Sequence, residues 1–267
     1  MDLLQSIILG AIQGITEFLP VSSTAHLVLL PWFFSWTDNG LPFNVALHMG
    51  SLLAIIYYFW RDWILIIKEF IQSVLSWSFD GRPNGKTGLY LIIATIPGAL
   101  AGVLFEQYAA GLLRHPLSVA FTLSFFGVVL YFSDRVSKKT RTVGEMNMLD
   151  CIIIGISQAF AIIPGVSRTG ITITGAMFRN LNREEAAKFS FLLGAPLIAG
   201  AGVFEARHLE YSAVMSLPFL AGVLASAVFA FLAIKFLLRF VRKSSYTVFV
   251  VYRLALSVLI AFLYLMR

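Results

Sequence analysis

The sequence has little charge and a single cysteine. Only 13% of its 267 residues are Asp, Glu, Lys or Arg, whereas 58% are hydrophobic, well above the roughly 45 to 50% of soluble domains. Cys151 alone excludes an intrachain disulfide and a CxxC metal or redox motif. The alternation of apolar and polar residues that marks half-buried strands is also missing. These shortages exclude a soluble domain and favour an all-α integral membrane protein.

Long apolar runs separated by short polar loops are the main feature that is present. A helix of about 20 apolar residues crosses the hydrocarbon core of a bilayer and satisfies its own backbone hydrogen bonds there. We expect six full transmembrane helices, at residues 43–60, 88–106, 116–133, 186–205, 212–235 and 246–266. Residues 63–77 carry Lys68, Glu69 and Gln72 on one face, which favours an amphipathic helix lying in the interface.

Two further pairs of apolar segments are too short for a crossing and are interrupted, one at Pro20 and the other near Pro164. We expect two re-entrant helical hairpins, at residues 1–20 with 22–35 and at residues 147–163 with 169–180. Backbone that leaves the helix at membrane depth is tolerated only where protein buries it or water lines it. The breaks therefore predict a cavity inside the membrane.

The two interrupted stretches match each other at an offset of 145 residues. The matched pairs are Gly10 and Gly155, Gln13 and Gln158, Val21 and Val166, Ser22 and Ser167, and Thr24 and Thr169. Duplicated halves of membrane proteins meet at a central site built from interrupted helices. We therefore expect a single polytopic membrane domain over residues 1–267, with repeats at about 1–133 and 147–266, and one site between the two breaks.

The distribution of basic residues predicts an orientation. Fifteen of the twenty lysines and arginines fall on one side of the predicted spans, and only Arg114, Arg207 and Arg267 fall on the other. The basic side is cytoplasmic by the positive-inside rule, so both termini are expected outside. Three full spans separate the hairpins, so the repeat is predicted to have inverted topology. Because the basic residues lie in loops between spans, nucleic acid is not expected as a partner.

The residues that can do chemistry gather at the two breaks. The first break holds Glu17, Ser22, Ser23, Thr24 and His26, and the second holds Ser167, Arg168 and Thr169. A charged group at membrane depth costs about 2.5 to 3.5 kcal/mol or more unless it is paired or wetted. Each residue alone has a structural explanation in helix packing, but the combination favours a functional site. Helix N-termini at both breaks would present N–H groups to an anion, which predicts a phosphate ligand.

These residues divide by role. Arg168 is expected to grip phosphoryl oxygens through its planar guanidinium. Ser23 is expected to attack phosphorus while His26 or Glu17 takes its proton; direct attack by a ring nitrogen of His26 is the alternative. Glu17, with Gln13 one helical turn earlier, could also hold a divalent cation that bridges the phosphates.

Four other polar residues are expected to have roles outside the chemical step. Ser22 and Ser167 correspond in the repeat and are expected to frame the site, which leaves the unmatched Ser23 for the chemistry. His48, early in the first span, is expected to be a packed polar group. Arg253, near the cytoplasmic end of the last span, is expected to extend its side chain to that face.

Two motifs carry a resemblance to a known family. EFLPVSSTAH at residues 17–26 and PGVSRTGIT at residues 164–172 resemble the signature motifs of the undecaprenyl-diphosphate phosphatases linked to bacitracin resistance, and the second fits the pattern PGxSRxxxT in full. The resemblance implies removal of the terminal phosphate of a C55 isoprenyl diphosphate with a divalent cation, Mg²⁺ or Ca²⁺. It also implies a site open to the periplasmic side of the bacterial inner membrane, and it adds Thr172 to the substrate-binding residues. Gln13 stands where many members have a second glutamate.

A membrane phosphatase is therefore the expected function, one that converts undecaprenyl diphosphate to undecaprenyl phosphate and recycles the lipid carrier for cell-wall synthesis. A lipid-phosphate transporter or flippase is the rival, because inverted repeats with broken helices are the architecture of secondary transporters. Pairing of Ser23 with His26 would favour hydrolysis, since transport needs no nucleophile. The sequence leaves the oligomeric state open, with a homodimer as one option.

Overall fold

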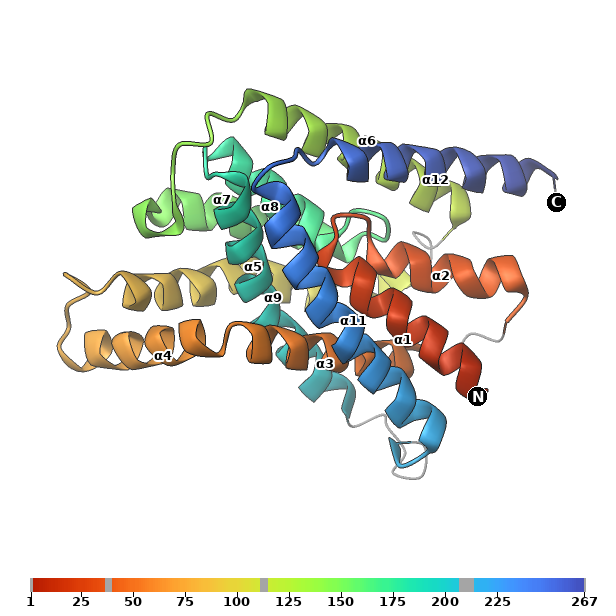
Figure 1. Ribbon diagram of the computed structural model, residues 1–267, viewed down its shortest axis with the longest axis horizontal. Coiled ribbons are helices and arrows are strands. Elements are labelled where there is room, and N and C mark those ends of the chain that lie inside the picture. Colours follow the sequence, from red (N-terminus) through yellow and green to blue (C-terminus); the bar gives the residue numbers. More distant parts are fainter. Residues whose placement is uncertain (1, 37–39, 111–114, 207–213, 267) are drawn as a thin grey trace.

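The computed structural model describes residues 2–36, 40–110, 115–206 and 214–266, and this part of the chain is almost wholly helical (Figure 1). The helices are α1 (Leu3–Phe18), α2 (Ser23–Phe34), α3 (Gly40–Tyr58), α4 (Trp60–Leu75), α5 (Pro83–Ala110), α6 (Pro116–Val136), η2 (Val143–Glu145), α7 (Met148–Ala159), η3 (Phe160–Ile162), α8 (Arg168–Phe178), α9 (Arg183–Glu205), α11 (Leu217–Val241) and α12 (Thr247–Met266). The predicted start of a span at residue 212, and the basic residues Arg114, Arg207 and Arg267, lie outside the described residues.

Polar caps fix where several of these helices begin. Asn147 accepts from the backbone N–H of Asp150 at 3.1 Å, and the Asp150 carboxylate accepts in return from the N–H of Asn147 at 2.8 Å, so α7 starts with a complete capping box. Asn182 caps α9 by accepting from the backbone N–H of Glu185 at 2.9 Å. Pro116 stands at the start of α6, where its missing N–H costs nothing.

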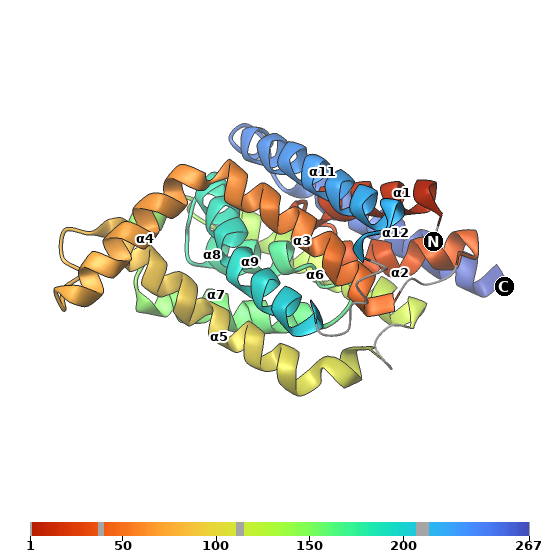
Figure 2. The same cartoon turned by 90° about the horizontal axis from the view of Figure 1, so that it is seen from below.

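Five of the described helices are long and apolar enough to cross a membrane, namely α5, α6, α9, α11 and α12. They correspond to five of the six predicted spans. The sixth predicted span is α3, which passes the same test only together with α4, and the pair is bent by 79° (Figure 2). An all-helical membrane protein is therefore confirmed.

The helix α4 packs along α5 and turns apolar side chains outward. Ile64, Leu65, Ile67 and Ile71 are exposed, while the carboxylate of Glu69 accepts from the amides at the start of α5. An apolar face open to the surroundings beside a polar loop suits a helix at the bilayer surface. The interfacial position of this helix stays a prediction.

Both predicted helix breaks are present. The first lies between α1 and α2, and the second lies between η3 and α8. Pro20 and Pro164 occupy these gaps, where the proline ring removes an N–H donor and prevents the helix from continuing. Each hairpin is therefore a helix, a short irregular segment and a second helix, as the sequence predicts.

The helices of the two predicted repeats pack in an exchanged pattern. The helix α1 packs along α11 of the other half, and its counterpart α7 packs along α5, the counterpart of α11. The helix α3 packs on its counterpart α9, and α6 packs on its counterpart α12, which Figure 1 shows side by side along one edge. Contacts that map onto one another in this way are expected from a two-fold relation between halves. The two breaks are consequently brought together in the middle of the molecule.

Small residues hold α1 tightly in place just before its break. A Cβ atom on Gly10 would lie 2.1 Å from the carbonyl oxygen of Gly222 in α11, and one on Gly14 would lie 2.4 Å from that of Ser226. Helices in lipid associate largely through such close backbone approach, which larger side chains prevent. The first break therefore starts from a rigid helix pair.

Ion pairs hold the end of the molecule that carries the loop 134–146. The fully buried Asp150 accepts from Arg141 and from Arg179, each at 2.6 Å, and Asp134 accepts from Arg183 at 2.7 Å. Removing one partner of a buried pair costs about 3 to 5 kcal/mol. Both carboxylates therefore have their ionic partners within the protein, while the three arginine side chains remain about a quarter exposed.

Candidate active site

Each break ends in a serine with an unusual backbone conformation. Ser22 (φ 74°, ψ 95°) is the N-cap of α2, and Ser167 (φ 70°, ψ 109°) is the N-cap of α8. Positive φ is uncommon for a residue with a Cβ atom and costs about 1 to 3 kcal/mol. The two serine hydroxyls accept from the N–H groups of Ala25 and Gly170, at 3.4 and 3.1 Å. Each break thus places the residue after its serine at the first position of a helix.

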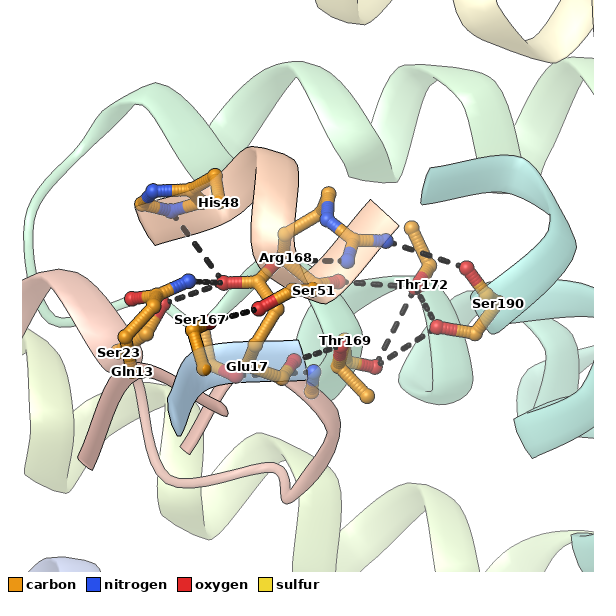
Figure 3. Close-up of polar contacts among 12 residues, drawn as sticks. Gln13, Glu17, Ser23, His48, Ser51, Ser167, Arg168, Thr169, Thr172 and Ser190 are labelled. Atoms are coloured by element: carbon orange, nitrogen blue, oxygen red, sulfur yellow. Dashed lines mark hydrogen bonds and ion pairs between the residues drawn. The ribbon is translucent and has the colours of Figure 1, made fainter. Parts of the chain in front are cut away.

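Glu17, in the last turn of α1, is the centre of the polar cluster (Figure 3). Arg168, at the start of α8, donates to its Oε1 atom at 2.8 Å across 151 residues of sequence. Ser23 donates to Oε2 at 2.7 Å, and Gln13 donates to the same oxygen at 2.9 Å. These bonds offset the cost of holding a carboxylate that is only 4% exposed. The two breaks therefore form one site.

A fourth partner of Glu17 is His48, from α3. Its Nε2 atom lies 3.3 Å from the carboxylate, and its Nδ1 atom lies 2.8 Å from the carbonyl oxygen of Asn44. A carbonyl oxygen only accepts, so Nδ1 carries a proton and Nε2 is left to face Glu17. The packed polar role expected for His48 is too modest, because the ring contacts the central carboxylate.

Contacts with α9 and with Thr172 hold Arg168 in position. Its Nη1 atom donates to the backbone carbonyl of Ser190 in α9 at 3.2 Å. A Cβ atom on Gly194 would lie 2.1 Å from the same nitrogen, so this glycine makes room for the guanidinium against α9. Thr172 donates to the carbonyl of Arg168 at 2.8 Å and shares a 2.6 Å hydrogen bond with the hydroxyl of Ser190. Thr172 thus supports the arginine and does not face the cavity.

Two threonines tie the breaks to each other and to their own turns. Thr169 donates to the backbone carbonyl of Glu17 at 2.6 Å, which joins the start of α8 to the end of α1. Thr24 lies 3.2 Å from the hydroxyl of Ser22, within the turn that begins α2. The predicted substrate-binding threonines are therefore near the site, with Thr169 committed to the backbone.

The predicted contact between His26 and Ser23 is wrong. Nδ1 of His26 donates to the carbonyl of Ser22 at 2.8 Å, and Nε2 accepts from the hydroxyl of Tyr252 at 2.7 Å. The His26 and Tyr252 rings also stack, with centroids 5.8 Å apart. A three-residue spacing brings two helical side chains within about 60° of each other, but packing against α12 turns this ring away from Glu17. Ser23 has Glu17 as its proton acceptor instead.

The prediction that Arg253 extends to the cytoplasmic face is also wrong. Its side chain is completely buried, and it donates to the backbone carbonyl of Gly165 in the second break at 2.9 Å. The reason is tertiary, because α12 packs against α6 and the arginine lies on the packed side of the helix.

A cavity of about 530 Å³ opens from the polar cluster. Its polar end is lined by Glu17, Ser23, Thr24, His48, Ser167 and Arg168. Its apolar walls come from α5, η3 and α9 and include Gly98, Ala99, Gly102, Val103, Ala161, Ile162, Pro196, Leu197, Ile198, Gly200, Ala201 and Phe204. A concave site with a few convergent polar groups and long apolar walls suits an amphiphile with an anionic head.

Gln13 and Glu17 supply oxygens of the kind that hard cations prefer. The Gln13 Oε1 atom is buried without a hydrogen-bond partner, while the amide nitrogen beside it donates to Glu17. Within the described ranges, no three His, Cys, Asp or Glu residues gather around a common point. The pair therefore fits the predicted divalent cation in donor type, with further oxygens needed from a ligand or water.

The comparison with known families bears on the whole of this arrangement. The family model described as bacitracin resistance protein BacA matches residues 6–259, a range that includes both breaks and the cavity. The chain belongs to the BacA family. Sequence reasoning had reached the same family through the two motifs at the breaks.

Relatives of this BacA-family chain match it from end to end. It is 50% identical to an undecaprenyl-diphosphatase of Moorella thermoacetica, over the whole of both chains. It is 43% identical to an undecaprenyl-diphosphatase of Caldicellulosiruptor bescii, over 100% of this chain and 99% of that one. An undecaprenyl-diphosphatase of Thermomicrobium roseum is 40% identical over 97% of each.

Sequence reasoning gave too small a role to one residue near this BacA-family site, His48, and missed another, Ser190. His48 had a signal, because an ionisable residue within a membrane segment indicates function by default. Ser190 had none, because a serine in an apolar helix is common, and its contact with Arg168 depends on how α9 packs against α8.

Proposed function

We propose that this protein hydrolyses the terminal phosphate of undecaprenyl diphosphate, and so returns undecaprenyl phosphate to cell-wall synthesis. One observation carries the proposal. Ser23 donates to one oxygen of Glu17 and Arg168 donates to the other, at the polar end of an apolar cavity. A hydroxyl, a base and an anion-binding group thus meet where a lipid diphosphate fits. The full-length relatives named undecaprenyl-diphosphatase support the same substrate.

The geometry supports attack by Ser23. As its Oγ atom bonds to the terminal phosphorus, Glu17 takes the hydroxyl proton over the 2.7 Å hydrogen bond. The bond from phosphorus to the bridging oxygen breaks, its electron pair stays on that oxygen, and undecaprenyl phosphate leaves. Glu17 passes the serine proton to the departing undecaprenyl phosphate and is a carboxylate again. Water then attacks the phosphoserine as Glu17 takes a water proton. The bond from phosphorus to the serine oxygen breaks, Glu17 returns the proton to that oxygen, and inorganic phosphate departs. His26 takes no part in these proton transfers, because both its ring nitrogens are engaged elsewhere.

Charge at the site suits a diphosphate. Arg168 now donates to Glu17, and a phosphoryl group would compete for that guanidinium, which binds such oxygens in a bidentate manner. The N-terminal ends of α2 and α8 meet at the site and add backbone N–H groups and positive dipole ends. Both contributions act most strongly on the charge that grows on the phosphoryl oxygens during transfer.

Glu17 and Gln13 are proposed to hold a divalent cation, Mg²⁺ or Ca²⁺, when substrate is bound. The cation would neutralise phosphate charge, which lowers the cost of bringing a nucleophile to an anion. The donor types and the unpartnered Gln13 Oε1 atom support this assignment. Chelation should abolish phosphate release, and Gln13→Ala should raise the cation concentration needed for half-maximal activity without changing which cation works.

The isoprenyl chain is proposed to lie along the apolar walls of α5 and α9. The cavity lining runs toward the C-terminal ends of these helices, as far as Val103 in α5 and Phe204 and Glu205 in α9. The positive-inside rule assigns those ends to the outer side of the membrane, which supports an opening to the periplasm. The exchanged packing of the helix pairs supports an inverted repeat of six spans and two re-entrant hairpins.

Labelling intact cells tests that orientation. In a Cys151→Ala background, a cysteine at the exposed Lys138 should resist an impermeant thiol reagent, whereas one at the exposed Asp2 should react. The opposite pattern would reverse the assigned orientation.

Phosphate release tests the activity itself. Purified wild-type protein given undecaprenyl diphosphate should release one inorganic phosphate for each undecaprenyl phosphate formed, and Ser23→Ala should release almost none. A folded wild-type protein that turns over no diphosphate in the presence of Mg²⁺ or Ca²⁺ would refute the proposal.

A lipid-phosphate flippase is the second candidate, supported by the broken helices and the central anion site. Sealed vesicles separate the two activities. Transport would move undecaprenyl phosphate between leaflets even in the Ser23→Ala protein, since movement needs no nucleophile. Hydrolysis without such movement supports the phosphatase alone.

A further inference from the structure

The molecule contains a second arginine beside the two breaks, and the proposed chemistry does not use it. Arg253 of α12 is completely buried. Its guanidinium reaches backbone carbonyl oxygens in both breaks: Nη2 donates to Gly165 at 2.9 Å and to Val166 at 3.2 Å, and Nη1 donates to Pro20 at 3.4 Å. Its Nε atom donates to Leu123 of α6 at 2.9 Å.

The hydrogen-bond partners of the Arg253 guanidinium are backbone carbonyl oxygens. Within the part of the chain that the structure describes, no carboxylate pairs with Arg253. A buried cation is costly unless its donors are satisfied. The carbonyls of Pro20, Gly165 and Val166 lie where the helices are interrupted, so they lack the intrahelical partner that a continuous helix supplies. One side chain thus satisfies the exposed backbone of two breaks.

The neighbouring backbone leaves room for the guanidinium. A Cβ atom on Gly170 would lie 3.1 Å from Nη1, and one on Gly127 would lie 3.4 Å from Nε. Thr122 of α6 adds a second support, because its hydroxyl donates to the carbonyl of Pro164 at 2.6 Å. The second break is therefore held at three consecutive residues, with Pro164 bonded from α6 and Gly165 and Val166 bonded from α12.

In both breaks, the carbonyls that accept hydrogen bonds from Arg253 lie within two residues of the strained serines. Pro20 is two residues before Ser22, and Val166 immediately precedes Ser167. A positive φ at such positions persists only when the surroundings enforce it. The backbone of these serines sets the direction in which the next residues, the attacking serine and the phosphate-binding arginine, leave their helices.

We propose that Arg253 is a positioning residue that fixes the two breaks relative to each other, with Thr122 as its aid at the second break. This role rests on the proposed function, because it aligns Ser23 with Arg168 over one phosphoryl group. A lysine could keep the positive charge, but a single ammonium lacks the planar fork that reaches both breaks at once. Charge alone therefore does not suffice at position 253.

Kinetics of Arg253→Lys test the role. A misplacement of about 1 Å costs about 100-fold in rate, so kcat should fall by about that factor while KM for undecaprenyl diphosphate stays within about threefold. The loss of several buried hydrogen bonds should also lower the thermal unfolding midpoint, so kcat and KM are measured at a temperature at which the variant is folded. Arg239→Lys, at an exposed position near the end of α11, is the matched control and should behave as wild type.

The outcomes separate this role from its alternatives. Wild-type kcat in folded Arg253→Lys would overturn the role, and so would a rise in KM with kcat unchanged. If that variant fails to fold, Thr122→Val decides the matter, because it removes the support at Pro164 alone and should lower kcat about tenfold. Unchanged kcat in Thr122→Val would then overturn the proposal. A wild-type protein that releases no phosphate would instead overturn the proposed function, and this role with it.

Discussion

The two helix breaks share a backbone and differ in the chemistry that it carries. Ser22 and Ser167 have φ values of 74° and 70° and cap their helices in the same manner. The residue that follows is a serine in the first break and an arginine in the second. The two breaks thus have one backbone geometry, and the difference at a single position gives the first a hydroxyl, at Ser23, and the second a guanidinium, at Arg168.

A second difference lies before the breaks. Glu17 lies in the last turn of α1. At the offset of 145 residues its counterpart is Ile162, which lines the apolar part of the cavity. One half therefore contributes the carboxylate and the other contributes hydrophobic wall. Elsewhere in the lining both halves contribute, with Arg168 of the second half at the polar end and Val103 of the first half in the apolar wall. The combination of polar and apolar surface in one cavity suits an amphiphilic substrate.

The largest effect should come from removing the unmatched hydroxyl. Ser23→Ala should lower kcat by more than about 1,000-fold, because a covalent nucleophile has no substitute. Ser22→Ala, which removes the matched hydroxyl and its cap, should lower kcat by less than about tenfold. Turnover of both variants in detergent measures the ratio. Retention of more than about a tenth of normal activity by Ser23→Ala would exclude the serine nucleophile.

Arg168→Lys tests the role of the second break, which we propose binds the phosphate. Lysine keeps the charge but loses the bidentate fork and the bond to Ser190, so kcat should fall by about 100-fold to 1,000-fold. Arg135→Lys, at an exposed position in the last turn of α6, serves as the control. Near-normal turnover by Arg168→Lys would remove the phosphate clamp from the mechanism.

The two histidines should differ in the direction opposite to the sequence-based expectation. His48→Gln should lower kcat by about tenfold to 100-fold, because it removes the ring that contacts the Glu17 carboxylate. His26→Gln should cost less than about tenfold, because His26 bonds to the carbonyl of Ser22 and to Tyr252 and not to Glu17. Turnover of both variants measures the difference, and a larger loss in His26→Gln than in His48→Gln would contradict the assignment.

The smallest effect is expected from glycine at the two caps. Ser22→Gly and Ser167→Gly each lose a capping oxygen but relieve a strained positive φ, so the free energy of unfolding should change by less than about 0.5 kcal/mol. Alanine at the same positions loses the cap and keeps the strain, and should destabilise by about 1 kcal/mol or more. Thermal unfolding of the four variants gives the comparison, and equal stability of the glycine and alanine variants would show that the strain is unimportant.

Much of the fold could be predicted because lipid imposes simple rules. The lengths of the apolar runs predicted the spans. The prolines beside clusters of serine and threonine predicted the helix breaks. The ends of helices were less accurate: α5 begins at Pro83, ahead of the predicted residue 88, and α11 continues to Val241, beyond the predicted 235. Apolar composition marks where a helix enters lipid, whereas the backbone continues helically into polar residues.

The site was predictable where charge had to be paired and unpredictable where packing decides. Glu17 and Arg168 could be brought together because each is costly alone at membrane depth. The orientation of the His26 ring and the burial of Arg253 depend on how α12 packs against α2 and α6. The sequence alone does not show that packing. A partner such as Tyr252 is visible only after the chain has folded.

The identity of the phosphorylated residue tests the central claim most directly. Enzyme turning over undecaprenyl diphosphate labelled in its terminal phosphate is divided, quenched in acid and in neutral denaturant, then digested and mapped by mass spectrometry. The account predicts acid-stable phosphate on Ser23, absent from the Ser23→Ala protein. Acid-labile phosphate on His26, or full turnover by a Ser23→Ala protein that carries no label, would contradict it.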